Sequence, residues 1–240
     1  MDWITDPQAW IALATLTALE IVLGIDNIVF ISILAGRLPE NRRNAARRTG
    51  LLLAMVMRIL LLLSIAWIIG LTRPLFSVLG AELSGRSLIL IAGGLFLIGK
   101  STREIHHKLE GPDQKKEIGK TSPSFSGVLI QILLLDLVFS LDSVITAVGM
   151  ADHVGVMIVA VVLAVGFMML FAKPIGEFVE RHPTVKMLAL SFLLMIGMAL
   201  VADGLDLHIP KGYIYFAMGF SLLVELLNLR IRAKKASATA

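Results

Sequence analysis

The chain alternates long apolar stretches with short polar ones. Seven of the apolar stretches have about the 17–25 residues that an α-helix needs to cross the hydrocarbon core of a bilayer. They predict membrane-spanning helices at residues 9–35, 47–72, 86–104, 126–150, 154–173, 185–203 and 211–230. Proline disrupts a helix least near its ends. We therefore expect helix boundaries near four prolines, Pro74, Pro174, Pro183 and Pro210.

The longest polar stretch, rich in Lys, Gly and Pro, separates the third span from the fourth and is typical of a linker. An odd number of spans in each half gives the two halves opposite orientations in the membrane. The predicted fold class is an all-α, polytopic membrane protein with seven transmembrane helices, built from two inverted three-helix repeats plus a seventh helix. The predicted parts are the first repeat at 1–104, a cytoplasmic linker at 105–125, the second repeat at 126–208, and the seventh helix with a basic cytoplasmic tail at 209–240.

Two of the predicted spans contain nearly the same acidic phrase. Residues 20–27 read EIVLGIDN, and residues 136–143, which begin 116 positions later, read DLVFSLDS. A carboxylate at the centre of a membrane helix costs roughly 2.5–3.5 kcal/mol on insertion scales, and such residues are usually functional. Matched acids in the two halves of a chain are typical of an ion site at the interface between repeats.

The spacing within each phrase limits how its two acids can act together. Residues six apart on a straight helix differ by about 240° in direction, so Glu20 and Asp26 would point to different faces. Glu20, Gly24 and Asn27 would share a face. Gly24, or Ser140 at the equivalent place, is where a break in the helix would free backbone carbonyls for a cation. Alternatively, the two acids of each helix serve separate faces.

The candidate metal ligands are the acids of both phrases and the polar residue that ends each phrase: Glu20, Asp26, Asn27, Asp136, Asp142 and Ser143. These hard oxygen ligands suit Mg²⁺, Ca²⁺ or Mn²⁺ better than a thiophilic ion. One divalent ion cannot neutralise four carboxylates, so some would be protonated in an empty site, which favours exchange of the cation for protons. Alternatively, the acids are structural and form salt bridges with Arg58 or Lys173.

Composition supports the membrane assignment. The chain is 57% hydrophobic and 17% charged, with a mean hydropathy of +0.84, whereas soluble domains carry about 25% charged residues. It has no cysteine, which excludes disulfides and thiolate metal sites. The net charge of +4 comes from basic residues in the loops, so it indicates topology rather than binding to nucleic acid.

The distribution of Lys and Arg predicts the orientation. Eighteen of these residues lie in the segments after spans one, three, five and seven, and three lie in the segments on the opposite side. By the positive-inside rule, the N-terminus is outside and the C-terminus is cytoplasmic.

Glycines in the spans, and isolated polar residues in or near them, lead to further expectations. Close helix packing is predicted at four glycines, Gly93, Gly94, Gly99 and Gly197. Glu225 is a proton relay, a supporting partner of the site, or an interfacial residue, and the sequence does not choose. His208 either caps a helix or forms an outer metal gate.

Four stretches resemble the TerC family of integral membrane proteins: residues 18–30, 103–111, 135–149 and 202–216. The resemblance implies a bacterial inner-membrane protein with a seven-helix fold related to LysE-type transporters. It implies manganese efflux, or manganese delivery to exported proteins. Expected partners are divalent cations, protons, the lipid bilayer, and exported metalloproteins or the secretion machinery. No tightly bound cofactor is expected, and Mn²⁺ or Ca²⁺ is the expected transported ion.

These observations leave two functions of different kinds. The first is a secondary transporter that exports a divalent cation, with Mn²⁺ chosen by the resemblance and not by the ligands. The second is a membrane scaffold or assembly factor with a structural cation site. The sequence contains no zincin motif, Walker A motif or adjacent catalytic Ser, His and Asp, so an enzyme is not predicted.

Overall fold

The computed structural model describes residues 5–64, 72, 74–78, 81–110, 124–150, 153–207 and 209–238. At some helical positions, Asp26 and Asp142 among them, only the backbone is described. These ranges contain seven long helices: α1 (Pro7–Ala35), α2 (Glu40–Leu63), α4 (Gly85–Leu109), α5 (Phe125–Met150), α6 (Val154–Arg181), α7 (Pro183–Gly204) and α8 (Lys211–Ala238). A short antiparallel hairpin, β1 (Pro74–Val78) with β2 (Ala81–Ser84), precedes α4. The predicted all-α class is correct apart from this hairpin.

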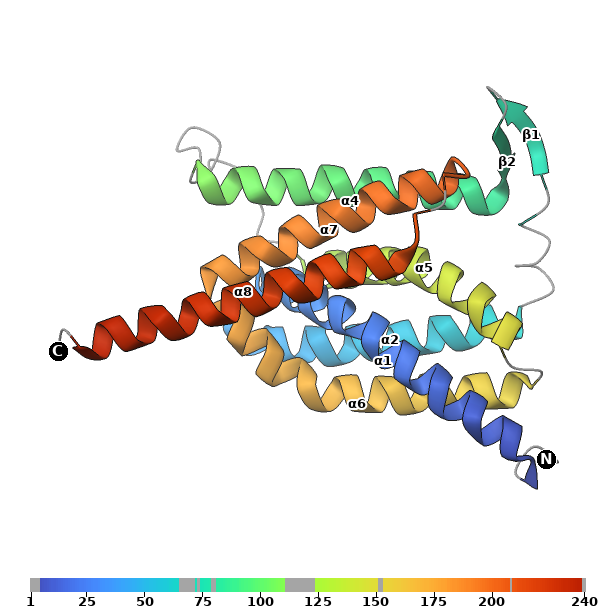
Figure 1. Ribbon diagram of the computed structural model, residues 1–240, viewed down its shortest axis with the longest axis horizontal. Helices are drawn as coiled ribbons and strands as arrows, with labels where there is room; N and C mark the ends of the chain where they lie inside the picture. The colour runs from blue at the N-terminus through green and yellow to red at the C-terminus, as the bar shows by residue number, and fades with distance from the viewer. Residues whose placement is uncertain are drawn as a thin grey trace.

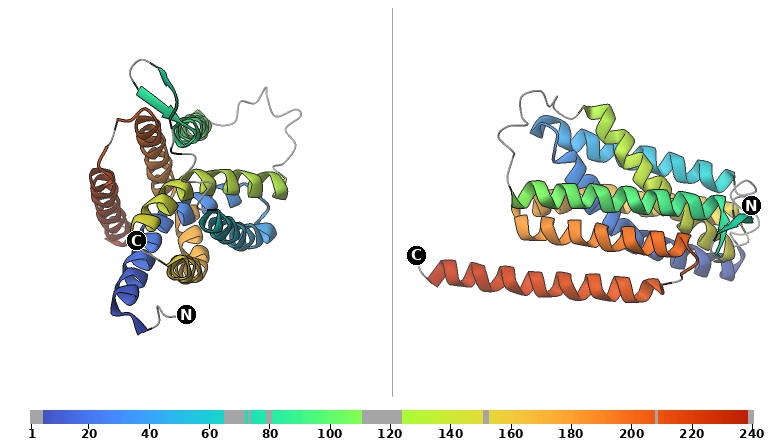
Figure 2. Two further views of the ribbon diagram at one scale, coloured as in Figure 1. Left: turned by 90° about the vertical axis from the view of Figure 1, so that its right-hand side faces the viewer. Right: turned by 90° about the horizontal axis from the view of Figure 1, so that it is seen from above.

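The helices run along one common direction, and the two termini lie at opposite ends of the bundle (Figures 1 and 2). The N-terminus, the hairpin and the α7–α8 connection share one end. The start of α2, the end of α4 and the C-terminus lie at the other end. With 29 residues, α1 is about 43 Å long, which exceeds the roughly 30 Å of a bilayer's hydrocarbon core.

Helices from the two halves of the chain pack against each other. The most extensive contacts join α4 with α7, α1 with α6, and α2 with both α5 and α6. Buried aliphatic side chains fill the interior, for example Leu16 and Ile28 of α1, Ile132 of α5 and Leu190 of α7. By contrast, α8 lies beside α7 at the edge of the bundle and leaves most of its apolar side chains exposed (Figure 2).

Local sequence explains where several helices begin. Asp6 caps α1 by accepting the backbone N–H of Gln8 at 2.9 Å. Ser84 caps α4 in the same way, accepting the N–H of Ser87 at 3.1 Å. Pro183 starts α7, where the missing N–H costs nothing because the first helical turn has no partner for it.

Four of the described helices are long and apolar enough to cross a membrane: Pro7–Ala35, Val154–Arg181, Pro183–Gly204 and Gly212–Arg232. The sequence predicted seven spans. The other three long helices lie where spans were expected, but α2 and α4 carry charged residues in one half of their length. Their role as spans therefore stays a prediction.

Two predicted boundaries were wrong. The second span was expected at 47–72, yet α2 covers Glu40–Leu63. Pro39 stands before the first turn, and the arginine-rich turns that follow are helical although they are too polar for a hydropathy window to detect. Residues 65–71, into which this span was expected to extend, lie outside the described residues. Similarly, Pro174 was expected near a boundary but lies inside α6.

The continuation of α6 past Pro174 has a physical cost. Proline lacks the N–H of the helical ladder, and helices commonly bend at such a position. Figure 1 shows α6 changing direction in its C-terminal part before the chain reaches α7. Membrane helices tolerate proline because neighbouring groups satisfy the freed carbonyl.

The proposed break at Gly24 is also wrong. Both α1 and α5 are continuous through Gly24 and Ser140, so neither helix is interrupted to free carbonyls for a cation. A side chain at Gly24 would overlap Met168 of α6. This glycine therefore allows α1 and α6 to pack closely.

Candidate cation site

Three helices bring charged side chains together in the interior. Arg58 of α2 is 4% exposed and lies between Glu20 of α1 and Asp136 of α5. Its guanidinium donates to Glu20 through Nη1. It donates to Asp136 from Nη2 at 2.7 Å and from Nε at 3.2 and 3.3 Å. One cation thus bridges two carboxylates that come from the two halves of the chain.

Neutral donors complete the environment of Asp136. The Ser140 hydroxyl donates to Asp136 Oδ2 at 3.1 Å, and the Asn27 amide donates weakly to Oδ1 at 3.5 Å. Burying charges is expensive, and the cost falls when each charge is paired and its remaining lone pairs are hydrogen-bonded. With two carboxylates and one guanidinium, this cluster carries a formal charge of −1 when all three groups are ionised.

Helix periodicity explains this convergence. Ser140 follows Asp136 by four residues and so lies one turn further along the same face of α5. Glu20 and Asn27, seven residues apart, share a face of α1 as the sequence predicted, and both are buried. The Ser143 hydroxyl donates to the carbonyl of Ser140 at 3.3 Å, which directs it along the same side of α5.

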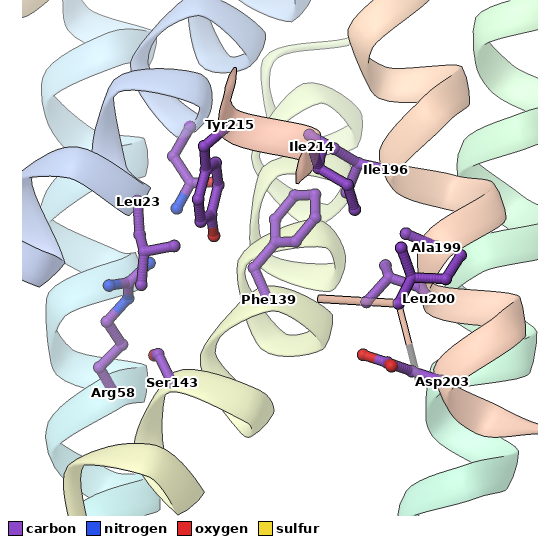
Figure 3. A pocket seen from close by; sticks show the side chains of 12 residues that line it. Leu23, Arg58, Phe139, Ser143, Ile196, Ala199, Leu200, Asp203, Ile214 and Tyr215 are labelled. Carbon is purple, nitrogen blue, oxygen red and sulfur yellow. The ribbon is translucent and has the colours of Figure 1, made fainter. Parts of the chain in front are cut away.

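A pocket of about 90 Å³ adjoins the cluster, with room for several water molecules. Arg58, Asn27 and Ser143 form part of its wall. Asp203 of α7 and Tyr215 of α8 contribute an acid and a phenol on other walls, and Figure 3 shows the Asp203 carboxylate directed into the space. The rest of the lining is apolar, with Leu23, Phe139, Ile196, Ala199, Leu200, Ile209 and Ile214. The pocket therefore connects the buried charges with the end of the bundle where α7 ends and α8 begins.

A second, smaller cavity also touches Arg58. It measures only about 10 Å³, and apart from Arg58 and Glu20 its walls are apolar side chains, among them Leu16, Met157 and Val161. Of the two cavities that Arg58 lines among the described residues, the one that contains Asp203 is therefore the larger.

A second set of ion pairs lies at the far end of the bundle. Glu180 of α6 accepts from Arg43 at 3.0 Å and from Arg47 at 2.5 Å. Arg37, in the α1–α2 connection, pairs with Glu104 of α4. Burial lowers the pKa of the Arg37 guanidinium, but arginine starts so high that the group stays protonated at neutral pH. The Glu180 pairs join α2 and α6, which belong to different halves, at the end opposite the pocket.

Comparison with known proteins decides the family. Residues 5–239 match the integral membrane protein TerC family. The chain belongs to the TerC family. The resemblance expected from the sequence is confirmed over nearly the whole chain.

Several TerC-family relatives are close in sequence. The chain is 62% identical to a UPF0053 protein of Haemophilus influenzae, over 96% of this chain and 98% of that protein. It is 59% identical to the UPF0053 inner membrane protein YgdQ of Escherichia coli K12, over 97% of each chain. The longer UPF0053 protein YegH of the same strain is 54% identical over 95% of this chain, but that match covers 43% of YegH. No solved structure matches.

Within this TerC-family chain, the predicted ligands fall into two groups. Glu20, Asn27 and Asp136 meet in the cluster, and Ser143 lies in the wall of the adjoining pocket. The side chains of the other two, Asp26 and Asp142, lie outside the described residues. Among the described residues, no three acidic or histidine side chains gather closely enough to hold a metal ion.

The salt bridges expected with Arg58 are present, whereas neither Glu20 nor Asp136 pairs with Lys173. Arg58 pairs with both Glu20 and Asp136. Lys173 is largely exposed and lies 3.9 Å from Glu177, one turn away on the same helix. His208, the candidate for an outer gate, lies outside the described residues.

Three polar residues of this region were not predicted as part of the site. Ser140 was considered only as the counterpart of Gly24, yet a hydroxyl four residues after a buried acid on a helix is within hydrogen-bonding reach of it. Asp203 and Tyr215 lie in a stretch that resembles the family, yet nothing in their spacing predicts that the end of α7 and the start of α8 fold over the α1–α5 acids. That placement depends on tertiary packing.

Proposed function

We propose that this chain is a secondary transporter that exports a divalent metal cation, Mn²⁺ in the first instance, across the bacterial inner membrane in exchange for protons. The observation that carries the proposal is that Glu20 and Asp136, at equivalent positions of the two acidic phrases, meet in the buried interior. Buried acids at the interface between two halves of a membrane protein are typical of ion-translocating sites.

The pattern of helix packing supports an inverted repeat of α1, α2 and α4 with α5, α6 and α7. In such a repeat, α1 corresponds to α5, α2 to α6 and α4 to α7. Exchanging each helix for its counterpart turns the α1–α6 contact into the α2–α5 contact, and both contacts are extensive. The same exchange leaves the α4–α7, α2–α6 and α1–α5 contacts in place. We propose on this basis that all seven long helices span the membrane and that the acids lie near mid-depth.

The positions of the basic residues support the proposed orientation. Arg37, Arg43 and Arg47 lie with Glu104 and Glu180 at one end of the bundle, the end at which the C-terminus lies (Figure 1). We propose that this end is cytoplasmic, according to the positive-inside rule. The pocket beside Arg58 would then face the outside.

The chemistry of the cluster supports a hard divalent cation and a role for protons. Carboxylates, the Asn27 amide and the Ser143 hydroxyl are oxygen ligands that suit Mn²⁺, Mg²⁺ or Ca²⁺. The positive charge of Arg58 neutralises one of the two carboxylates that it contacts. A site without a bound cation therefore needs fewer protons to become neutral than four isolated carboxylates would. We propose Glu20, Asp26, Asn27, Asp136, Asp142 and Ser143 as the residues that bind the ion along its path.

One observation favours a second candidate function. Glu20 and Asp136 already have a cation, Arg58, as their partner. A membrane scaffold or assembly factor would use the same three charges to hold α1, α2 and α5 together and would move no ion. Substitution of an acid by a neutral residue distinguishes the two functions. A scaffold would lose stability or assembly, whereas a transporter would lose ion flux.

Cellular manganese content tests the proposal. In a host that lacks its own manganese exporters, the wild-type chain is expected to lower the manganese content of cells grown in excess Mn²⁺, measured by elemental mass spectrometry. Asp26→Asn and Asp142→Asn are expected to abolish the decrease while remaining in the membrane at wild-type abundance. The matched control is Glu177→Gln, an acid whose one ion pair among the described residues is with the largely exposed Lys173. Unchanged manganese content with the wild-type chain would favour the scaffold.

A further inference from the structure

A charged side chain of the protein already occupies the place between the two acids where a transported cation would be expected. Arg58 is buried, and three of its nitrogens donate to Glu20 and Asp136. A divalent cation that used the same carboxylates would lie within a few ångströms of the guanidinium, and the repulsion between them is strong where the dielectric constant is low. The cation and Arg58 therefore cannot both hold Glu20 and Asp136.

Two cavities of different size adjoin Arg58. The one that it shares with Met157 and Val161 measures only about 10 Å³. The other, of about 90 Å³, also has Arg58 in its wall and offers the side chain more room. Asp203 lies on the far wall of that pocket with its carboxylate directed inward (Figure 3). An arginine side chain is long, keeps its charge and forms bidentate pairs with carboxylates, so Asp203 is a suitable second partner.

We infer that Arg58 is a built-in competitor of the transported cation. It pairs with Glu20 and Asp136 when the site is empty, and it moves toward Asp203 when a divalent cation takes those carboxylates. The inference rests on the proposed transport function and specifies how the ion is released. The return of Arg58 to the acids displaces the ion, so the wild-type protein trades binding affinity for faster release.

Equilibrium binding of Mn²⁺ at one fixed pH tests this competition, with free Mn²⁺ measured by electron paramagnetic resonance. Arg58→Gln removes the competing charge and is expected to bind Mn²⁺ at least about tenfold more tightly than wild type. Its Mn²⁺ flux in proteoliposomes is expected to fall because release is slower. Arg58→Lys keeps the charge and is expected to stay near the wild-type Kd. Arg103→Gln, at an exposed position of α4, is the matched control.

Added guanidinium ion distinguishes competition from a purely structural role. In Arg58→Gln, millimolar guanidinium is expected to raise the Kd for Mn²⁺ back toward wild type, whereas wild type and Arg103→Gln should not respond. If Arg58→Gln does not fold, Asp203→Asn decides. Without its second partner Arg58 leaves the acids less readily, so the Kd of Asp203→Asn should rise several-fold at unchanged thermal stability.

The outcomes separate this inference from the proposed function. Mn²⁺ binding by Arg58→Gln at or below wild-type affinity would overturn the competition while leaving transport by the wild type intact. An unchanged Kd in Asp203→Asn would overturn it equally. A wild-type protein that neither binds nor carries Mn²⁺, Ca²⁺ or Mg²⁺ would overturn the proposed function, and this inference with it.

Discussion

At the scale of single residues, Asp136 is the best-satisfied member of the buried cluster. It accepts from Arg58, Ser140 and Asn27, whereas the only donor to Glu20 among the described side chains is Arg58. A buried charge that loses its partner is far more costly than a lost neutral hydrogen bond. The contribution of each side chain to stability should therefore depend on whether its removal leaves a charge unpaired.

Paired substitutions measure this difference. Arg58→Gln leaves Glu20 and Asp136 without a counter-charge and is expected to lower the free energy of unfolding by about 3–5 kcal/mol. Ser140→Ala, one turn from Asp136 and fully buried, removes a single hydroxyl donor and is expected to cost about 1 kcal/mol. Thermal unfolding of both variants in the same detergent would show the difference. Equal losses would mean that the two acids do not depend on Arg58 for their charge compensation.

At the scale of secondary-structure elements, the α4–α7 contact depends on small residues. A Cβ at Gly94 would lie 2.5 Å from the carbonyl oxygen of Gly197 and 2.7 Å from Val201 Cγ2. Gly93 faces the side chain of Val138 on α5 in a similarly close contact. The sequence predicted close packing at these positions correctly, but it also included Gly99, which has nothing within 4 Å of the position its Cβ would take.

Gly94 and Gly99 therefore form a matched pair on one helix. Gly94→Ala is expected to push α4 away from α7 and to lower the midpoint of thermal unfolding by several degrees. Gly99→Ala is expected to leave the midpoint unchanged or raise it slightly, because alanine favours a helix over glycine by about 1 kcal/mol. Circular dichroism at increasing temperature would measure both. A loss at Gly99 as large as that at Gly94 would contradict the packing described for α4.

The elements also show what a single sequence can predict. Hydropathy located the seven long helices of the described residues because apolar runs of this length have few other structures available to them. It failed at the start of α2, where arginines satisfied by Glu180 continue the helix, and at Pro174, which the surrounding bundle accommodates. The acids Glu20 and Asp136 were found from their repetition. Their meeting at Arg58, and the approach of Asp203, depend on long-range packing that no local pattern contains.

At the scale of the whole molecule, the two ends of the bundle differ. The pocket beside Arg58 lies toward the end where α7 passes into α8, and the ion pairs of Arg37, Arg43 and Arg47 join the helices at the opposite end. A transporter that works by alternating access needs one open and one closed side in each state. The difference between the two ends is therefore compatible with the proposed cation transport.

Mn²⁺ flux in proteoliposomes of the purified protein tests the account most directly. With an indicator dye quenched by Mn²⁺ inside the vesicles, the wild type is expected to take up Mn²⁺ faster when the lumen is more acidic than the bath, since protons leave as Mn²⁺ enters. Asp26→Asn should lose this uptake and Glu177→Gln should retain it. A folded wild-type protein that shows no flux of Mn²⁺, Ca²⁺ or Mg²⁺ under any pH gradient would contradict the account.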